Sequence, residues 1–159
     1  MIEIQAPNPI PEEYKFLPRI FLAGTIDMGN SENWQQKLTP ILKKKYPGWL
    51  ILNPRRDDWD SSWEQTLQNP NFVKQVNWEQ KHLMSSTLVI FNFLEDSKSP
   101  ITLMELGLIV GKRLYGAGKD KAVVICPKGY YRSGNVYISC ERSAIPFYYS
   151  MEEYLNTLN

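Results

Sequence analysis

The chain has 159 residues, 43% of them hydrophobic and 22% charged, which suits one soluble domain large enough to bury its own core. The formal net charge of +1 speaks against a nucleic-acid-binding surface and against attraction to an acidic membrane. No apolar run is long enough to cross a bilayer and no secretion leader is recognisable, so we expect a cytoplasmic protein without nucleic-acid or membrane partners.

Four continuous apolar runs are predicted to be buried strands, and they cover residues 19–24, 49–54, 88–94 and 122–127. A first helix is predicted after Ser31, which is suited to cap it, and Pro40 is expected to kink or shorten that helix. Two more helices are predicted to begin at Asn69–Pro70 and at Ser99–Pro100, because proline fits the first turn of a helix.

The remaining segments carry weaker patterns. Residues 1–18 hold four prolines and are predicted to form an extended N-terminal arm before a domain over residues 19–159. Residues 55–69 are polar and read as a long loop, and residues 134–142 fit either a strand or a short helix. Ser150 followed by Glu153 fits the capping box of a terminal helix.

The alternation of strands and helices defines the expected fold class. We predict a single-domain α/β protein with a doubly wound, flavodoxin-like or Rossmann-like sheet, mostly parallel, with helices on both faces. Ligands of such sheets bind beyond the carboxyl ends of the strands. The segments that follow predicted strands, Gly24–Thr25, Asn53–Arg55 and Glu95–Ser99, are therefore expected to meet at that edge.

The cysteines and the histidine give no metal site. Cys126 and Cys140 lack the spacing of metal ligands and are expected to be buried free thiols in a reducing compartment. The single histidine, His82, is expected to be partly exposed on a helix, and it has no obvious partners for a Ser–His–Asp triad. The glycine patterns of dinucleotide-binding sheets and of P-loops are absent as well.

Two glutamates remain as candidates for chemistry. Glu105 lies in an apolar helical segment, where an unpartnered carboxylate is costly to bury, so it either faces solvent or has a function. Glu79 falls on the apolar side of the preceding helix, although a helical glutamate is more often solvated. A pair of carboxylates can break a C–N or C–O bond at the anomeric carbon of a sugar, one as nucleophile and the other handling protons.

Several segments together resemble the nucleoside 2-deoxyribosyltransferase-like family. They are Phe21–Ile26, Asn53–Arg56, Trp78–Glu79 with Leu83, Ser99–Gly107, Cys126–Val136 and Cys140–Arg142. The resemblance covers roughly residues 19–150, and the segments that carry Glu105 and Asn135 are fairly specific in combination.

The resemblance implies an enzyme that exchanges the base of a 2′-deoxynucleoside through a covalent deoxyribosyl intermediate, without a metal or organic cofactor. Glu105 matches the nucleophile and Glu79 the acidic residue that protonates the base. Gly24 and Thr25 match the loop lining the base pocket, with Asp27 and Trp34 as neighbours. Asn135 matches an asparagine that reaches the sugar of an adjacent subunit. The implied partners are a nucleoside or nucleotide, a free base and further copies of the chain, in a homo-oligomer.

One residue departs from the transferase pattern. Six residues before the nucleophile the transferases carry an aspartate that binds the sugar 5′-hydroxyl, whereas this chain has Ser99. A related branch, the nucleoside 5′-monophosphate N-glycosidases, has serine there, because a hydroxyl tolerates a phosphate that a carboxylate would repel. Arg55 or Arg56 is suited to pair with such a phosphate. The alternatives are that Ser99 only caps the helix, or that the chain is a non-catalytic nucleotide sensor.

Overall fold

The computed structural model describes residues 2–60, 62–116 and 121–158 and confirms the predicted α/β class. Six strands follow the order β1-β3-β2-β4-β5-β6, and the four strand pairings that lie within one unit are all parallel. Without β1 at the edge, this is the strand order of a doubly wound flavodoxin-like sheet. The chain divides into two compact units, residues 1–22 with 26–86 and residues 23–25 with 87–159.

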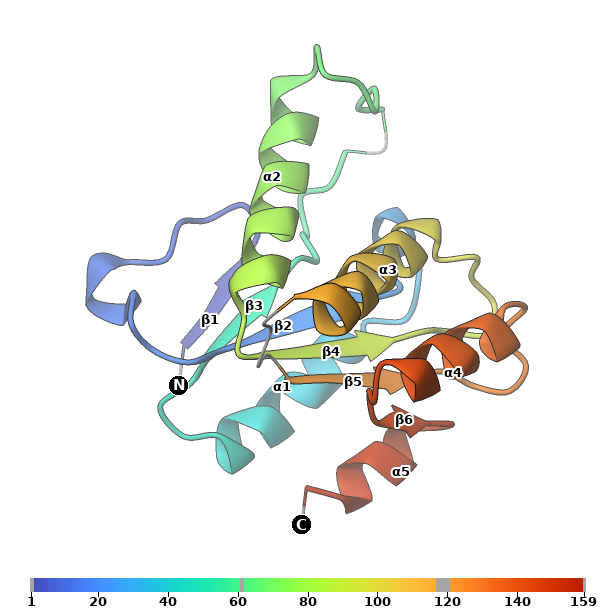
Figure 1. The fold of residues 1–159 in the computed structure, drawn as a ribbon. Helices are drawn as coiled ribbons and strands as arrows, with labels where there is room; N and C mark the ends of the chain where they lie inside the picture. The colour runs from blue at the N-terminus through green and yellow to red at the C-terminus, as the bar shows by residue number, and fades with distance from the viewer. Residues whose placement is uncertain (1, 61, 117–120, 159) are drawn as a thin grey trace. The chain divides into compact units, whose positions relative to one another are not determined.

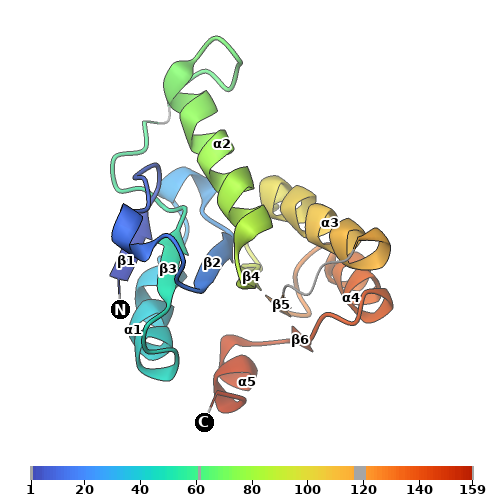
Figure 2. The same cartoon turned by 60° about the vertical axis from the view of Figure 1, so that its left-hand side comes forward.

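The first unit contains three strands, two α-helices and two short 3-10 helices. The strands are β1 (Ile2–Gln5), β2 (Arg19–Gly24) and β3 (Leu50–Asn53), and the helices are α1 (Trp34–Lys45) and α2 (Pro70–Ser85), with 3-10 turns at Glu12–Tyr14 and Asp27–Gly29. Figures 1 and 2 show α1 and α2 on opposite sides of these strands. Helices on both faces explain why Leu50, Ile51 and Leu52 are fully buried.

The N-terminal arm is a strand at its beginning. Residues Ile2 to Gln5 pair in register with Leu50 to Asn53, which the sequence did not reveal because the alternation in so short a segment is weak. Farther along the arm, the Trp78 indole of α2 donates to the Asn8 carbonyl at 2.7 Å. The arm is thus attached to the first unit by backbone pairing and by a tryptophan.

Helix α1 starts later and runs farther than predicted. Its N-cap is Asn33, whose side chain accepts from the Gln36 amide, and the Ser31 hydroxyl donates instead to the Ile26 carbonyl. Pro40 lies inside the helix, which nevertheless continues to Lys45. The prediction of a Ser31 cap was therefore wrong, and of the two effects expected of Pro40, a kink or a shortening, the shortening does not occur.

Helix α2 begins as predicted, with the Asn69 side chain accepting from the amides of Asn71 and Phe72. The prediction for His82 was wrong, because this side chain is only 4% exposed and its ring packs edge-on against Trp78 at 4.5 Å. Burial lowers the pKa of His82 to about 4, with the nearby Lys81 and Arg19 acting in the same direction.

The second unit begins with the end of β2 and contains three further strands and three helices. The strands are β4 (Leu88–Asn92), β5 (Lys121–Ile125) and β6 (Phe147–Tyr148), and the helices are α3 (Pro100–Tyr115), α4 (Ser133–Arg142) and α5 (Met151–Asn156). Helix α4 lies beside α3, and α5 lies on the opposite side of the strands from α3 (Figures 1 and 2). The guanidinium of Arg113 at the end of α3 fixes the chain after α4 by donating to the Ser143 and Ala144 carbonyls.

The ambiguous segment 134–142 is helical, because Val136 and Cys140 are buried four residues apart while Ile138 between them is 56% exposed. Strand β6 was not predicted, since two residues carry no periodicity. The predicted cap of α5 is confirmed: the Ser150 hydroxyl accepts from the Glu153 amide. Both cysteines are buried free thiols, as expected, and burial raises the pKa of each to about 12.

Candidate active site

The second unit includes the end of β2, so the point where the strand order reverses can be described within it. The Thr25 amide donates to the Asn92 carbonyl at the end of β4 at 2.9 Å. Gly24 has φ 147°, a conformation that side chains with a Cβ rarely adopt, which explains the glycine at this turn. The turn lies at the carboxyl ends of two strands, where open α/β sheets bind ligands.

Three buried hydroxyl groups gather after these strand ends. The Ser99 hydroxyl bonds to that of Thr25 and donates to that of Ser97 at 3.0 Å, and the Thr25 hydroxyl accepts from the Leu94 amide. Thr25, Ser97 and Ser99 are 1%, 7% and 4% exposed. We call these three residues the hydroxyl cluster. It joins the turn after β2 to the loop before α3.

Ser99 occupies the N-cap position of α3 but does not cap the helix with its side chain, so that prediction was wrong. Its backbone is left-handed, with φ 44° and ψ 52°, which costs a residue other than glycine free energy. The loop before α3 is also held by Tyr130, a residue of the segment after β5, whose hydroxyl donates to the Lys98 carbonyl at 2.7 Å. Tyr130 is 1% exposed and packs on Phe93 with ring centroids 4.9 Å apart.

Glu105 lies on the buried side of α3, six residues after Ser99. It is 6% exposed and shares that side with Thr102, Leu106 and Ile109. The alternative of a solvated glutamate is therefore excluded. The opposite side of the helix exposes apolar residues instead, namely Ile101, Met104 and Leu108 at 56%, 48% and 42%. The helix thus buries a carboxylate among apolar residues and exposes further apolar side chains on its opposite side, unlike an ordinary surface helix with a polar outer face.

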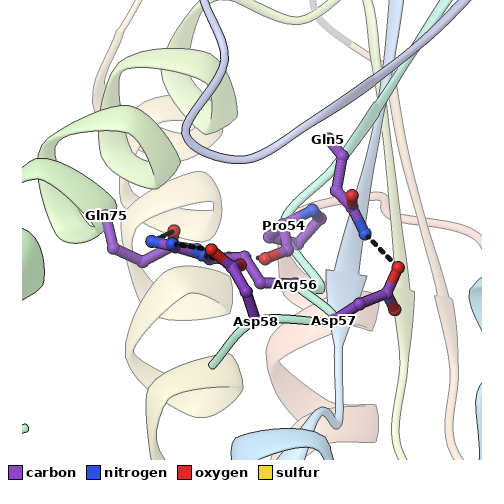
Figure 3. A network of polar contacts seen from close by, with 6 residues as sticks. All are labelled: Gln5, Pro54, Arg56, Asp57, Asp58 and Gln75. Carbon is purple, nitrogen blue, oxygen red and sulfur yellow. Dashed lines mark hydrogen bonds and ion pairs between the residues drawn. The ribbon is translucent and has the colours of Figure 1, made fainter. Parts of the chain in front are cut away.

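In the first unit, Glu79 is half-buried on α2 and is held by a neighbour one turn earlier. The side-chain amide of Gln75 donates to Glu79 Oε1 at 2.8 Å and to the Pro54 carbonyl at 3.0 Å. Figure 3 shows Gln75 reaching Pro54 and Arg56, the residues that follow β3. Burial raises the pKa of Glu79 to about 7, and the bond from Gln75 partly opposes this rise.

Arg56 and its neighbours extend this network. The guanidinium of Arg56 makes a two-pronged ion pair with Asp58, with both N–O distances at 2.8 Å, and lies 4.9 Å from the centre of the Trp63 ring. Its other nitrogen approaches Gln75 Oε1 at 3.5 Å. On the far side of the loop, Gln5 of β1 donates to Asp57 (Figure 3).

Arg55, which the sequence suggested as a possible phosphate contact, binds the backbone of the first unit in this structure. Its guanidinium donates to the carbonyls of Gly29, Ser31 and Glu32 and to the Ser31 hydroxyl, at 2.8 to 3.4 Å. Four hydrogen bonds donated by this side chain, which is 8% exposed, thus hold the segment 29–32 that leads into α1. A hollow of 290 Å³ lies beside it, lined by Gly29, Asn30, Asn33, Arg55, Arg56, Asp57 and Trp59.

The other predicted site residues lie in varied surroundings. Asp27 is exposed in a 3-10 turn with φ 47°, and Trp34 is 3% exposed at the start of α1, a core position of the first unit. Asn135 is exposed on the first turn of α4 in the second unit. Sequence reasoning missed Ser97, Gln75 and Tyr130, although the four-residue spacing of Gln75 and Glu79 was a usable signal.

The strand order and helices define the chain as a doubly wound α/β protein, a fold that serves many unrelated activities. Within that class, the chain belongs to the nucleoside 2-deoxyribosyltransferase-like family, which matches residues 17–130.

No curated protein matches the chain. Among solved structures, a conserved protein from Enterococcus faecalis V583 is similar at 11% identity and a TM-score of 0.48, over 89% of this chain and 86% of that one. Within the described residues, no helix is long and apolar enough to cross a membrane, and no group of three or more acidic, histidine or cysteine side chains is placed to hold a metal ion.

Proposed function

We propose that this protein cleaves the N-glycosidic bond of a 2′-deoxynucleoside and transfers the sugar to a second base. The observation that carries the proposal is the inward-facing carboxylate of Glu105, which is 6% exposed on α3. The loop before this helix contributes Ser97 and Ser99 to the hydroxyl cluster. A carboxylate kept out of water in this way is a stronger nucleophile than a solvated one. Family membership supports the reaction class.

The proposed reaction is a double displacement. A Glu105 oxygen forms a bond to C1′ while the C1′–N bond breaks and its electron pair leaves with the base. Glu79 supplies the proton that the departing base requires; burial raises its pKa to about 7, a value that suits proton donation near neutral pH. The incoming base then attacks C1′ and frees the Glu105 carboxylate. No metal or organic cofactor takes part in this scheme.

The remaining roles concern binding. We assign Gly24 and Thr25, at the turn after β2, to the base side of the ligand, with Asp27 and Trp34 as less direct contributors. Asn135 is proposed to reach the sugar bound by a second copy of the chain, in a homo-oligomer. Its exposure on α4, beside the exposed apolar Ile138 and next to a helix that exposes Ile101, supports that arrangement.

Base exchange tests the proposal directly. The protein is incubated with 2′-deoxyadenosine or 2′-deoxycytidine and a foreign free base, and new nucleosides are separated by chromatography. We expect exchange in the wild type and its loss by several orders of magnitude in Glu105→Ala, with the fold retained by circular dichroism. Glu152→Ala, at an exposed carboxylate on α5, is the matched control and should remain active. Full activity of Glu105→Ala would refute the assignment.

One residue favours a second candidate function, hydrolysis of the N-glycosidic bond of nucleoside 5′-monophosphates. Ser99 places a hydroxyl where a carboxylate would repel a phosphate, close to the N-terminus of a sixteen-residue helix. If phosphate is recognised there, Ser99→Asp should reduce cleavage of 2′-deoxynucleoside 5′-monophosphates at least about tenfold relative to free nucleosides. Release of free base and sugar phosphate without an acceptor base would identify the hydrolase. Ligand binding without turnover would instead identify a sensor.

A further inference from the structure

Gln75 is a fully enclosed polar side chain whose hydrogen bonds are all directed within the first unit. It is 2% exposed and lies on α2, one turn before Glu79. Both hydrogens of its amide nitrogen have acceptors, the Pro54 carbonyl at 3.0 Å and Glu79 Oε1 at 2.8 Å. Its amide oxygen faces the Arg56 guanidinium (Figure 3), and the distance to the nearest guanidinium nitrogen is 3.5 Å.

These surroundings permit only one orientation of the amide group. If the amide were flipped, its oxygen would face two other oxygens, those of Pro54 and Glu79, and its NH₂ group would face the positive guanidinium of Arg56. Arg56 is itself fixed, because Asp58 binds it through two oxygens and the Trp63 ring lies against it. Pro54 and Arg56, in the loop after β3, therefore fix the orientation in which the Gln75 NH₂ group points at Glu79.

We propose that Gln75 is a positioning residue for Glu79, whose amide holds Oε1 as a hydrogen-bond acceptor so that the carboxyl carries and delivers its proton on Oε2. The physical reason is that the carbonyl oxygen of a carboxylic acid is the better acceptor, so the amide binds that oxygen and the proton resides on the other. The proposal rests on the function assigned to Glu79 above and adds the residue that orients it.

The proton balance is simple. When the C1′–N bond breaks, the proton passes from Glu79 Oε2 to a ring nitrogen of the departing base, which keeps the electron pair of that bond. Glu79 is left as a carboxylate, and the amide of Gln75 stabilises that charge at Oε1. The proton returns to Oε2 from the acceptor base, or from water in the hydrolytic reaction.

The first test follows the wild-type protein without substrate. The side-chain amide signals of Gln75 are recorded by ¹⁵N NMR between about pH 4 and pH 9, with those of exposed Gln80 on the same helix as the internal control. We expect the Gln75 signals to shift with a midpoint close to the Glu79 pKa of about 7, and to lose that shift in Glu79→Gln. A flat Gln75 titration would overturn the proposal, whatever the enzyme activity.

The second test separates positioning from general stability by the choice of leaving group. Gln75→Met and Gln75→Leu should slow release of adenine from 2′-deoxyadenosine about 10- to 100-fold, since general acid catalysis contributes about 10²–10⁴-fold. Release of 4-nitrophenolate from a 4-nitrophenyl 2-deoxyriboside, which needs no proton, should change less than about threefold. Equal losses on both substrates would overturn the positioning role. Inactivity of the wild type would instead refute the proposed function, while the NMR titration still decides the Gln75–Glu79 link.

Discussion

Replacing Glu79 with glutamine should stabilise the protein at alkaline pH and leave its stability unchanged near pH 4. Burial raises the pKa of Glu79 from 4.5 to about 7, so the folded protein holds this proton more tightly than the unfolded chain does. As the pH rises between these two values, the unfolded chain loses the proton first and the free energy of unfolding falls. At about 1.4 kcal/mol per pKa unit, the loss reaches at most about 3 kcal/mol above pH 7.

Glutamine removes this loss because it is neutral at every pH and keeps an oxygen that can accept from Gln75. The assay is urea unfolding at pH 4 and pH 8.5, followed by tryptophan fluorescence. All five tryptophans belong to the same unit as Glu79, so the signal reports on that unit: Trp34, Trp49, Trp59, Trp63 and Trp78. Glu64→Gln, at an exposed position, is the matched control. An equal effect of Glu79→Gln at both pH values would refute the reasoning.

Three further substitutions test other contacts by the same unfolding assay. Arg55→Ala should destabilise the protein by about 2–4 kcal/mol, because three carbonyls lose a charged donor; a change below about 0.5 kcal/mol would contradict this. Asn69→Ala should cost about 1 kcal/mol through the lost cap of α2, whereas Asn69→Asp should restore it. Burial lowers the His82 pKa to about 4, so the wild type loses up to about 3 kcal/mol of stability as the pH falls from 6.5 towards 4. His82→Phe should remove this loss, and an unchanged dependence of stability on pH over that range would contradict the prediction.

Strands β2, β3, β4 and β5 and the start of α2 could be predicted because their signals are local. A continuous apolar run such as Leu88–Asn92 indicates a strand that is buried on both faces. At the start of α2, Asn69 caps the helix by accepting from the nearby amides of Asn71 and Phe72, and Pro70 fits the first turn. Strands β1 and β6 could not be predicted. Strand β1 alternates apolar and polar residues instead of forming a continuous apolar run, and β6 has only two residues. Each is stabilised by the neighbour it pairs with, β3 or β5, which lies outside its own segment of the sequence.

In the candidate site, too, some features could be predicted from local sequence and others depend on contacts between distant segments. Glu105 was predictable as a residue in apolar company, and the four-residue spacing on α2 placed Glu79 near the buried residues of its helix. The hydrogen-bond partners of Ser99 and Arg55 were not predictable, because these partners come close only when distant segments of the chain fold together. The alternative that Ser99 only caps the helix is wrong, because its hydroxyl bonds to Thr25, which lies 74 residues away. The sequence suggested Arg55 or Arg56 as a phosphate contact but gave no sign that Arg55 binds carbonyls about 24 residues away.

The sequence by itself determined the α/β class and the two glutamates on which the proposed chemistry depends, since apolar runs and helical spacing are properties of neighbouring residues. Only the tertiary structure decided that Glu105 is buried and that Glu79 is held by Gln75. It also showed that Ser99 belongs to the hydroxyl cluster. Desolvation and hydrogen bonding depend on segments that fold together, so a carboxylate acquires its pKa and its orientation only when the chain has folded.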